Sequence, residues 1–183
     1  MKGLRYMQDL MRNQFYKQRS DFELSAIERD KTQVMPEGVS VQTDIPYMND
    51  GDKAHRMDVY RPEGSESTTL PVVINIHGGG LLIGSKEFNR FFCAKLSRLG
   101  YLVFSIEYRL VPDCMVFDQF SDVCNAFKYI NAHLGEYNGD SNHIYGVADS
   151  GGAYLLTYTA AMAKNRELAK AAHVKPQKFS FRA

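Results

Sequence analysis

The sequence predicts an α/β fold built on a doubly wound, mostly parallel sheet. From residue 71 onward, β-branched apolar runs alternate with helical patterns, which is the order that produces parallel strands joined by helices. Glycine clusters follow two of those runs, at 77–80 and 148–152. The chain has 183 residues and 44% hydrophobic content, which is enough for one hydrophobic core.

Helical spacing marks the N-terminal segment, where apolar residues recur at Leu4, Met7, Met11 and Phe15. A second short helix is expected through Phe22, Leu24 and Ile27. We therefore assign residues 1–34 to N-terminal helices and residues 35–183 to the α/β domain. That domain opens with two antiparallel strands, around 39–41 and 57–59, joined by the turn at 49–52.

The remaining elements alternate in type. Strands are predicted at 72–76, 101–106 and 144–148, because these runs are short and apolar. The periodicity predicts helices over 88–99, 116–134 and 151–164, with Gly100 placed to end the first of them. Residues 176–183 resemble the start of another strand, because Phe179 and Phe181 alternate with polar residues.

Composition excludes several function classes. The net charge is +1 and Lys and Arg are not clustered, so we expect no nucleic-acid partner. No run approaches the about 18 apolar residues that a membrane span needs, and residues 1–14 lack a signal-peptide core, so we expect a cytoplasmic protein. The cysteines are too dispersed for a metal site and are expected as reduced, buried thiols: Cys93, Cys114 and Cys124.

The first glycine cluster is His77-Gly78-Gly79-Gly80, directly after a predicted strand. Glycines allow a positive φ and let another atom approach the backbone. The loop could therefore aim N–H groups at a developing negative charge. Its alternative is an ordinary mobile connection between a strand and a helix.

The second cluster is Ala148-Asp149-Ser150-Gly151-Gly152, between a predicted strand and a helix. A serine at such a sharp turn exposes its Oγ above the sheet, and small residues two before and two after it let the two backbones meet. Gly152 meets this need, and Ala148 stands where glycine is usual. The alternative is a serine that only caps the helix.

Together, the clusters indicate an oxyanion hole beside a nucleophile, if their strands are neighbours. The sequence resembles the hormone-sensitive-lipase-like branch of the α/β-hydrolases in three stretches: HGGGLLIGS at 77–85, YRLVP at 108–112 and ADSGGAYL at 148–155. The resemblance covers about residues 35–183 and implies that residues 1–34 begin a cap. It also implies a serine carboxylic ester hydrolase without cofactor or metal, acting on small-molecule esters. Leu81 departs from the aromatic residue common at its position.

By this resemblance, Ser150 is the nucleophile and the N–H groups of Gly79, Gly80 and Gly151 form the oxyanion hole. In this fold the catalytic acid and histidine follow the serine, but only Glu167 and His173 do so here. Both are expected far from Ser150, since Glu167 lies on the order of 25 Å along the helix.

The histidines before Ser150 are not expected to act as its base. His55, His133 and His143 fall away from the site, and His77 is expected to support the glycine loop. Asp149 is interpreted as structural. We therefore expect a fragment that lacks the triad acid and histidine, is inactive alone, and self-associates through an exposed sheet edge.

Two other functions stay open. The fold also hosts binding proteins that keep the pocket and lose a triad member. A peptidase or thioesterase on the same scaffold would carry the same residues around Ser150.

Overall fold

A five-stranded sheet lies at the centre of the computed structural model, which describes residues 2–176 and 181–182. The strand order is β1-β2-β4-β3-β5. The strands are β1 (Val39–Pro46), β2 (Arg56–Pro62), β3 (Leu70–Ile76), β4 (Leu102–Ile106) and β5 (Gly139–Ala148). β3 pairs in parallel with β4 and β5, whereas β2 pairs antiparallel with β1 and β4. The α/β sheet is confirmed, and its parallel half carries both glycine clusters.

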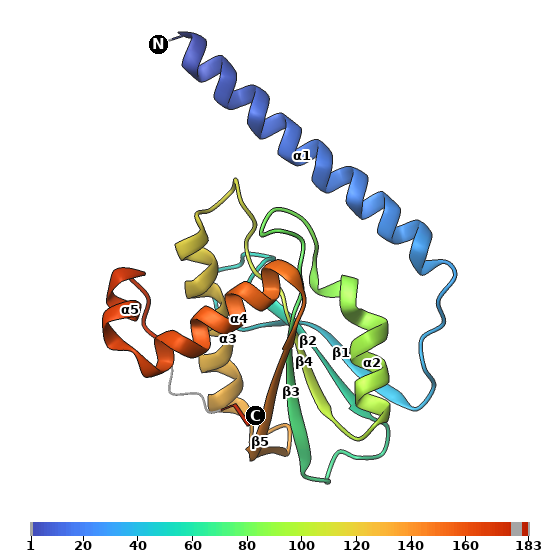
Figure 1. Ribbon diagram of the computed structural model, residues 1–183. Coiled ribbons are helices and arrows are strands. Elements are labelled where there is room, and N and C mark those ends of the chain that lie inside the picture. The colour runs from blue at the N-terminus through green and yellow to red at the C-terminus, as the bar shows by residue number, and fades with distance from the viewer. Residues whose placement is uncertain (1, 177–180, 183) are drawn as a thin grey trace.

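Helices cover both faces of this sheet, as a doubly wound fold requires (Figure 1). α2 (Arg90–Arg98) follows the short 3-10 helix η1 (Lys86–Asn89) and covers one face. α3 (Val116–His133) and α4 (Ser150–Lys164) cover the other, and α5 (Arg166–Ala171) follows α4.

The core divides into two layers because side chains alternate along each strand. Val72, Ile74 and Ile76 are buried on the side of α3 and α4. Val73 lies in a smaller cluster with Cys93 of α2. Both layers are closed by fully buried residues, so the central strand β3 is held rigidly on its two faces. The end of β3 is therefore a firm support for the glycine loop.

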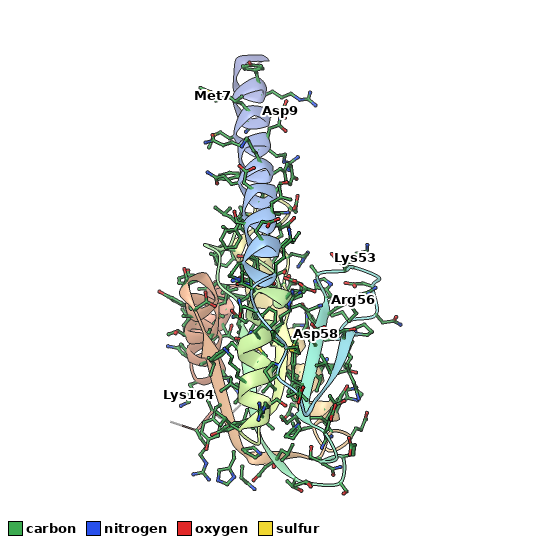
Figure 2. All side chains as sticks on the ribbon, turned by 90° about the vertical axis from the view of Figure 1, so that its right-hand side faces the viewer. Met7, Asp9, Lys53, Arg56, Asp58 and Lys164 are labelled. Carbon is green, nitrogen blue, oxygen red and sulfur yellow. The ribbon has the colours of Figure 1, made fainter. Side chains whose placement is uncertain are left out.

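α1 (Lys2–Asp30) is one continuous helix, where two were predicted. Residues 16–21 contain neither glycine nor proline, so nothing in them breaks the helix. Its N-terminal half projects beyond the body, with Met7 and Asp9 far from the sheet (Figures 1 and 2). Four large apolar side chains are exposed there: Tyr6, Met7, Leu10 and Met11.

The end of the chain gives two further differences. β5 begins at Gly139, before the predicted start at Ile144. The prediction missed the first residues of the strand because they are polar and carry no apolar pattern. Of the strand predicted at 176–183, residues 177–180 and 183 lie outside the described part. Within that part, the Arg182 N–H donates to the Ile144 oxygen of β5 at 2.8 Å. No helix of the described chain combines the length and the apolar character needed to cross a membrane.

Candidate active site

Ser150 occupies a strained turn between β5 and α4. It is the first residue of α4, its φ is 45°, and it is exposed. A left-handed backbone is uncommon for a residue with a side chain and costs on the order of 1–3 kcal/mol. A Cβ at Gly152 would lie 2.3 Å from the Ile76 oxygen and 2.4 Å from the His77 oxygen. The turn therefore presses the start of α4 against the end of β3, and only glycine fits there.

The glycine loop also has an unusual backbone. Gly79, Gly80 and Leu81 have consecutive φ values of 116°, 61° and 69°. The Gly79 oxygen accepts from the N–H groups of Leu82 at 3.1 Å and Ile83 at 3.0 Å, which closes the loop on itself. A run of left-handed residues turns successive N–H groups toward one side, and such an arrangement binds anions.

The two turns lie against each other. A Cβ at Gly151 would lie 3.0 Å from the Leu81 nitrogen and 3.1 Å from the Gly80 nitrogen. Ser150, Gly80 and Gly151 are thus brought together, and Gly79 directly precedes Gly80. The N–H groups at the start of α4 have no acceptor within the helix, so the Gly151 N–H faces no competing helical bond. The sequence did not indicate that the Leu81 nitrogen is equally close.

Asp149 connects the turn at residues 148–152, called the elbow below, to the glycine loop. Its Oδ1 accepts from the Gly78 N–H at 3.0 Å and from the Asn89 Nδ2 at 3.1 Å. Asn89 Nδ2 also donates to the Oδ1 of the buried Asn75 at 3.2 Å. The carboxylate is therefore oriented by η1 and β3 together, and it faces the loop rather than the Ser150 hydroxyl. The sequence assigned it a structural role but carried no sign of Asn89.

His77 is buried beneath the loop and both of its ring nitrogens are engaged. Nε2 lies 2.9 Å from Glu107 Oε1, and Nδ1 lies 2.8 Å from the Gly78 oxygen. The ring stacks on Tyr108, whose hydroxyl donates to the His77 oxygen at 2.8 Å. Burial lowers the pKa of His77, but the charge and hydrogen bond of Glu107 outweigh it, so the net pKa is raised. A ring held as a double donor supports the loop and cannot take a proton from Ser150.

All five histidines lie in the described part of the chain, and none of them is hydrogen-bonded to Ser150 there. Three have carboxylate partners of their own: His55 with Asp50 and Asp122, His133 with Glu136, and His143 with Asp140. Glu167 and His173 lie in and after α5, beyond the far end of α4. At 1.5 Å per residue, α4 separates them from Ser150 by roughly 20 Å.

Free thiols and metal ligands are also placed by the structure. Cys93 and Cys124 are buried and Cys114 is partly buried, all three unpaired as thiols. Burial raises the pKa of Cys93 and Cys124 to about 12. Across residues 2–176 and 181–182, no three His, Cys, Asp or Glu side chains are grouped to hold a metal ion.

The sequence around this site matches a known protein family. The BD-FAE family model matches residues 57–182, which includes β3, the glycine loop and the elbow. The chain belongs to the BD-FAE family. It is thereby an α/β-hydrolase of the esterase type, and the predicted resemblance to ester hydrolases of this fold is confirmed.

Individual relatives of this BD-FAE chain are esterases. Esterase LipQ of Mycobacterium tuberculosis is 28% identical and covers 69% of the chain and 30% of its own length. Isoprenylcysteine alpha-carbonyl methylesterase ICME of Arabidopsis thaliana is 25% identical, covering 62% of the chain and 26% of itself. The crystal structure of Esterase B from Lactobacillus Rhamnosis has a TM-score of 0.89 at 26% identity, covering 94% of the chain and 55% of that protein. The chain thus spans less than a third of these curated relatives and about half of the solved esterase.

Proposed function

We propose that this protein is a serine carboxylic ester hydrolase in which Ser150 is the acyl-accepting nucleophile. The observation that supports this most directly is the left-handed Ser150 turn packed against the Gly80 backbone. Ser150 Oγ attacks the ester carbonyl carbon, and the carbonyl oxygen becomes an oxyanion. The N–H groups of Gly79, Gly80 and Gly151 stabilise that charge, aided by the positive end of α4.

The attack needs a base, because a serine hydroxyl is a poor nucleophile until its proton is removed. His77 is engaged by Glu107 and Gly78, and the other described histidines lie elsewhere. None of the five histidines, all of which the structure describes, is therefore placed to act as this base. The 183-residue chain alone is proposed to acylate slowly and to deacylate slowly, since both steps use the same base.

Small-molecule carboxylic esters are the proposed substrates, in keeping with the esterase names of the relatives. No cofactor takes part in the proposed reaction. We further propose a cytoplasmic protein without a nucleic-acid partner, which self-associates through the β5 edge of the sheet. β5 pairs with β3 on one side. The described residues form no strand on its other side, although Arg182 donates its backbone N–H to the Ile144 oxygen and its Nε to the Asn142 oxygen.

Chemical rescue tests the nucleophile. Imidazole in the buffer can stand in for the missing base while p-nitrophenyl acetate supplies the acyl group. Imidazole assists both steps, but p-nitrophenoxide is a far better leaving group than the serine alkoxide, so acylation should outpace deacylation. We therefore expect one acetyl group to accumulate on Ser150, seen by intact mass and located by peptide mapping. Its rate should exceed acetylation of the exposed Ser67 and Ser141 by about 100-fold or more, since those hydroxyls face no preorganised donors.

Ser150→Ala is the matched control and should lose the imidazole-dependent acetylation. Acetylation of Ser150 no faster than that of Ser67 and Ser141 would contradict the assignment and favour a non-catalytic binding protein.

Analytical ultracentrifugation over a concentration series tests self-association, and a monomer at all concentrations would refute it.

A further inference from the structure

Arg19 of α1 makes three polar contacts with the body of the protein. Its Nε donates to the Leu82 oxygen at 3.1 Å, and its Nη2 donates to the Val111 oxygen at 3.0 Å. Its Nη1 contacts Asp113 Oδ2 at 2.9 Å. The Arg19 side chain is 19% exposed, whereas Lys17, two residues earlier, is 75% exposed and pairs only within α1. One planar guanidinium thus joins α1, the glycine loop and the segment after β4.

One acceptor of Arg19, the Leu82 oxygen, belongs to the carbonyl side of the glycine loop. Leu82 follows the left-handed residues, and the neighbouring Leu81 oxygen accepts from the Val111 N–H at 3.0 Å and Gln119 Nε2 at 2.9 Å. The amide side of the same loop faces Gly151, through the Gly80 and Leu81 nitrogens. Donors from outside therefore hold one side of the loop and leave the other side directed at the elbow.

External support matters here because the internal hydrogen bonds of the loop, from the Leu82 and Ile83 N–H groups to the Gly79 oxygen, do not hold the Leu82 carbonyl. Three consecutive left-handed residues belong to no helix or strand, so their φ and ψ values persist only where the surroundings fix them. The N–H groups stabilise an oxyanion only if they are already aimed at it. Loosening the Leu82 carbonyl would let the adjacent peptides rotate, and the donors would lose their aim.

We infer that Arg19 is a positioning residue, which holds the glycine loop in the orientation that the oxyanion needs. The inference rests on the proposed function of Ser150. It makes the location of α1 a condition for reactivity, although the N-terminal half of α1 stands clear of the body. It assigns to residues 1–34 an effect on the chemistry in addition to their place beside the domain.

Three variants separate this role from simple attachment of α1. Arg19→Ala removes all three contacts. Asp113→Ala removes the ion pair and the hydrogen bond from Tyr16 but leaves the donations to Leu82 and Val111. Lys17→Ala is the control, because it breaks an ion pair on the same helix without touching the body.

We expect imidazole-assisted acetylation of Ser150 to fall between about 10- and 100-fold in Arg19→Ala, because small displacements of catalytic donors have effects of that size. Asp113→Ala should lose less than about 3-fold, which is a conservative bound for an exposed ion pair. Lys17→Ala should match the wild type. Arg19→Lys keeps a charge beside Asp113 but has no fork to reach both carbonyls, so it should fall between Arg19→Ala and the wild type.

Amide hydrogen exchange gives a readout that does not depend on Ser150. The Leu82 and Ile83 N–H groups both donate to the Gly79 oxygen, so their exchange reports the closed loop. They should exchange at least about 10-fold faster in Arg19→Ala than in Asp113→Ala, with exchange in β3 and β4 unchanged. Unchanged exchange in Arg19→Ala, or equal effects of Asp113→Ala and Arg19→Ala, would overturn the inference. If wild-type Ser150 is not acetylated, the proposed function fails, and amide hydrogen exchange alone decides the role of Arg19. If Arg19→Ala does not fold, the exchange rates in Arg19→Lys are compared with those in Asp113→Ala instead.

Discussion

Ser150 and Gly152 share one turn but place opposite demands on their residues. Ser150 keeps a side chain in a left-handed backbone, while Gly152 must have none because carbonyl oxygens of β3 fill the space. The strain at Ser150 is sustained by this packing on both sides. The same turn therefore exposes the Ser150 hydroxyl and packs its backbone closely against the end of β3.

Gly152→Ala should destabilise the protein severely. Its new methyl group would lie 2.3 Å from the Ile76 oxygen, and a backbone atom cannot move aside as a flexible side chain can. We expect a loss of about 3 kcal/mol or more in the free energy of unfolding, measured by urea denaturation. Gly135→Ala is the control, since a Cβ there meets nothing within 4 Å. A loss of under about 1 kcal/mol in Gly152→Ala would show that the turn can open without cost to the fold.

The residues that could be predicted from the sequence are those whose requirement is local. The turn at Ser150 and Gly151 and the turn at 77–80 could be predicted because turns leave a pattern in neighbouring residues, while the catalytic roles of these residues stay predictions. Arg19 and its acceptor Leu82 are 63 positions apart, and the partners Asn89 and Asp149 are 60 apart. No spacing pattern connects such residues, so only the folded chain reveals them.

Among the elements, α1 departs most from what the sequence indicated. Its polar middle interrupted the apolar pattern and predicted two helices, although helix propensity continues through it. β3, β4, α2, α3 and α4 were predicted closely because each buries a periodic face, whereas β5 begins before its predicted start and α5 was not predicted. α1 instead is held by a few contacts in its C-terminal half, such as Phe22 stacked on Phe88 at 4.5 Å between ring centres.

Because only the C-terminal half of α1 is attached, two alanine substitutions in this helix should differ in their effect on the free energy of unfolding. Phe22→Ala should lower the free energy of unfolding by roughly 1–2 kcal/mol, because it removes a stacked ring pair. Leu10→Ala should change it by less than about 0.5 kcal/mol, since that side chain is 54% exposed. Circular dichroism during urea unfolding measures both. A larger loss from Leu10→Ala would mean that the projecting half packs against something in solution.

For the molecule as a whole, the buried His77–Glu107 pair links stability to pH. The net pKa of His77 is raised in the folded protein by Glu107, with Asp149 adding to the effect, whereas an unfolded histidine titrates near about 6.5. The folded state therefore binds the proton more tightly. Its stabilisation is complete below about pH 6.5 and is lost as the pH rises through the folded pKa of His77.

Stability should accordingly decline as the pH rises above about 6.5, the ordinary pKa of histidine. Urea unfolding at several pH values measures the slope. Glu107→Gln keeps a hydrogen-bond acceptor for His77 but removes the charge, so its slope should be flatter even if it is less stable overall. A wild-type stability that rises over the same change in pH would contradict the protonated His77.

The order of the strands has a consequence for how new groups can reach Ser150. β5 and β1 are the two edge strands of the described sheet, and the nucleophile stands just after the carboxyl end of β5. A strand added in parallel beside it would run about 4.8 Å away and would finish at the same level. A side chain at the carboxyl end of the added strand would lie next to the Ser150 hydroxyl, and β3 and the glycine loop would not have to move. The β5 edge, where Arg182 already donates its N–H to the Ile144 oxygen, is thus a place at which an incoming strand could bring a proton acceptor to Ser150.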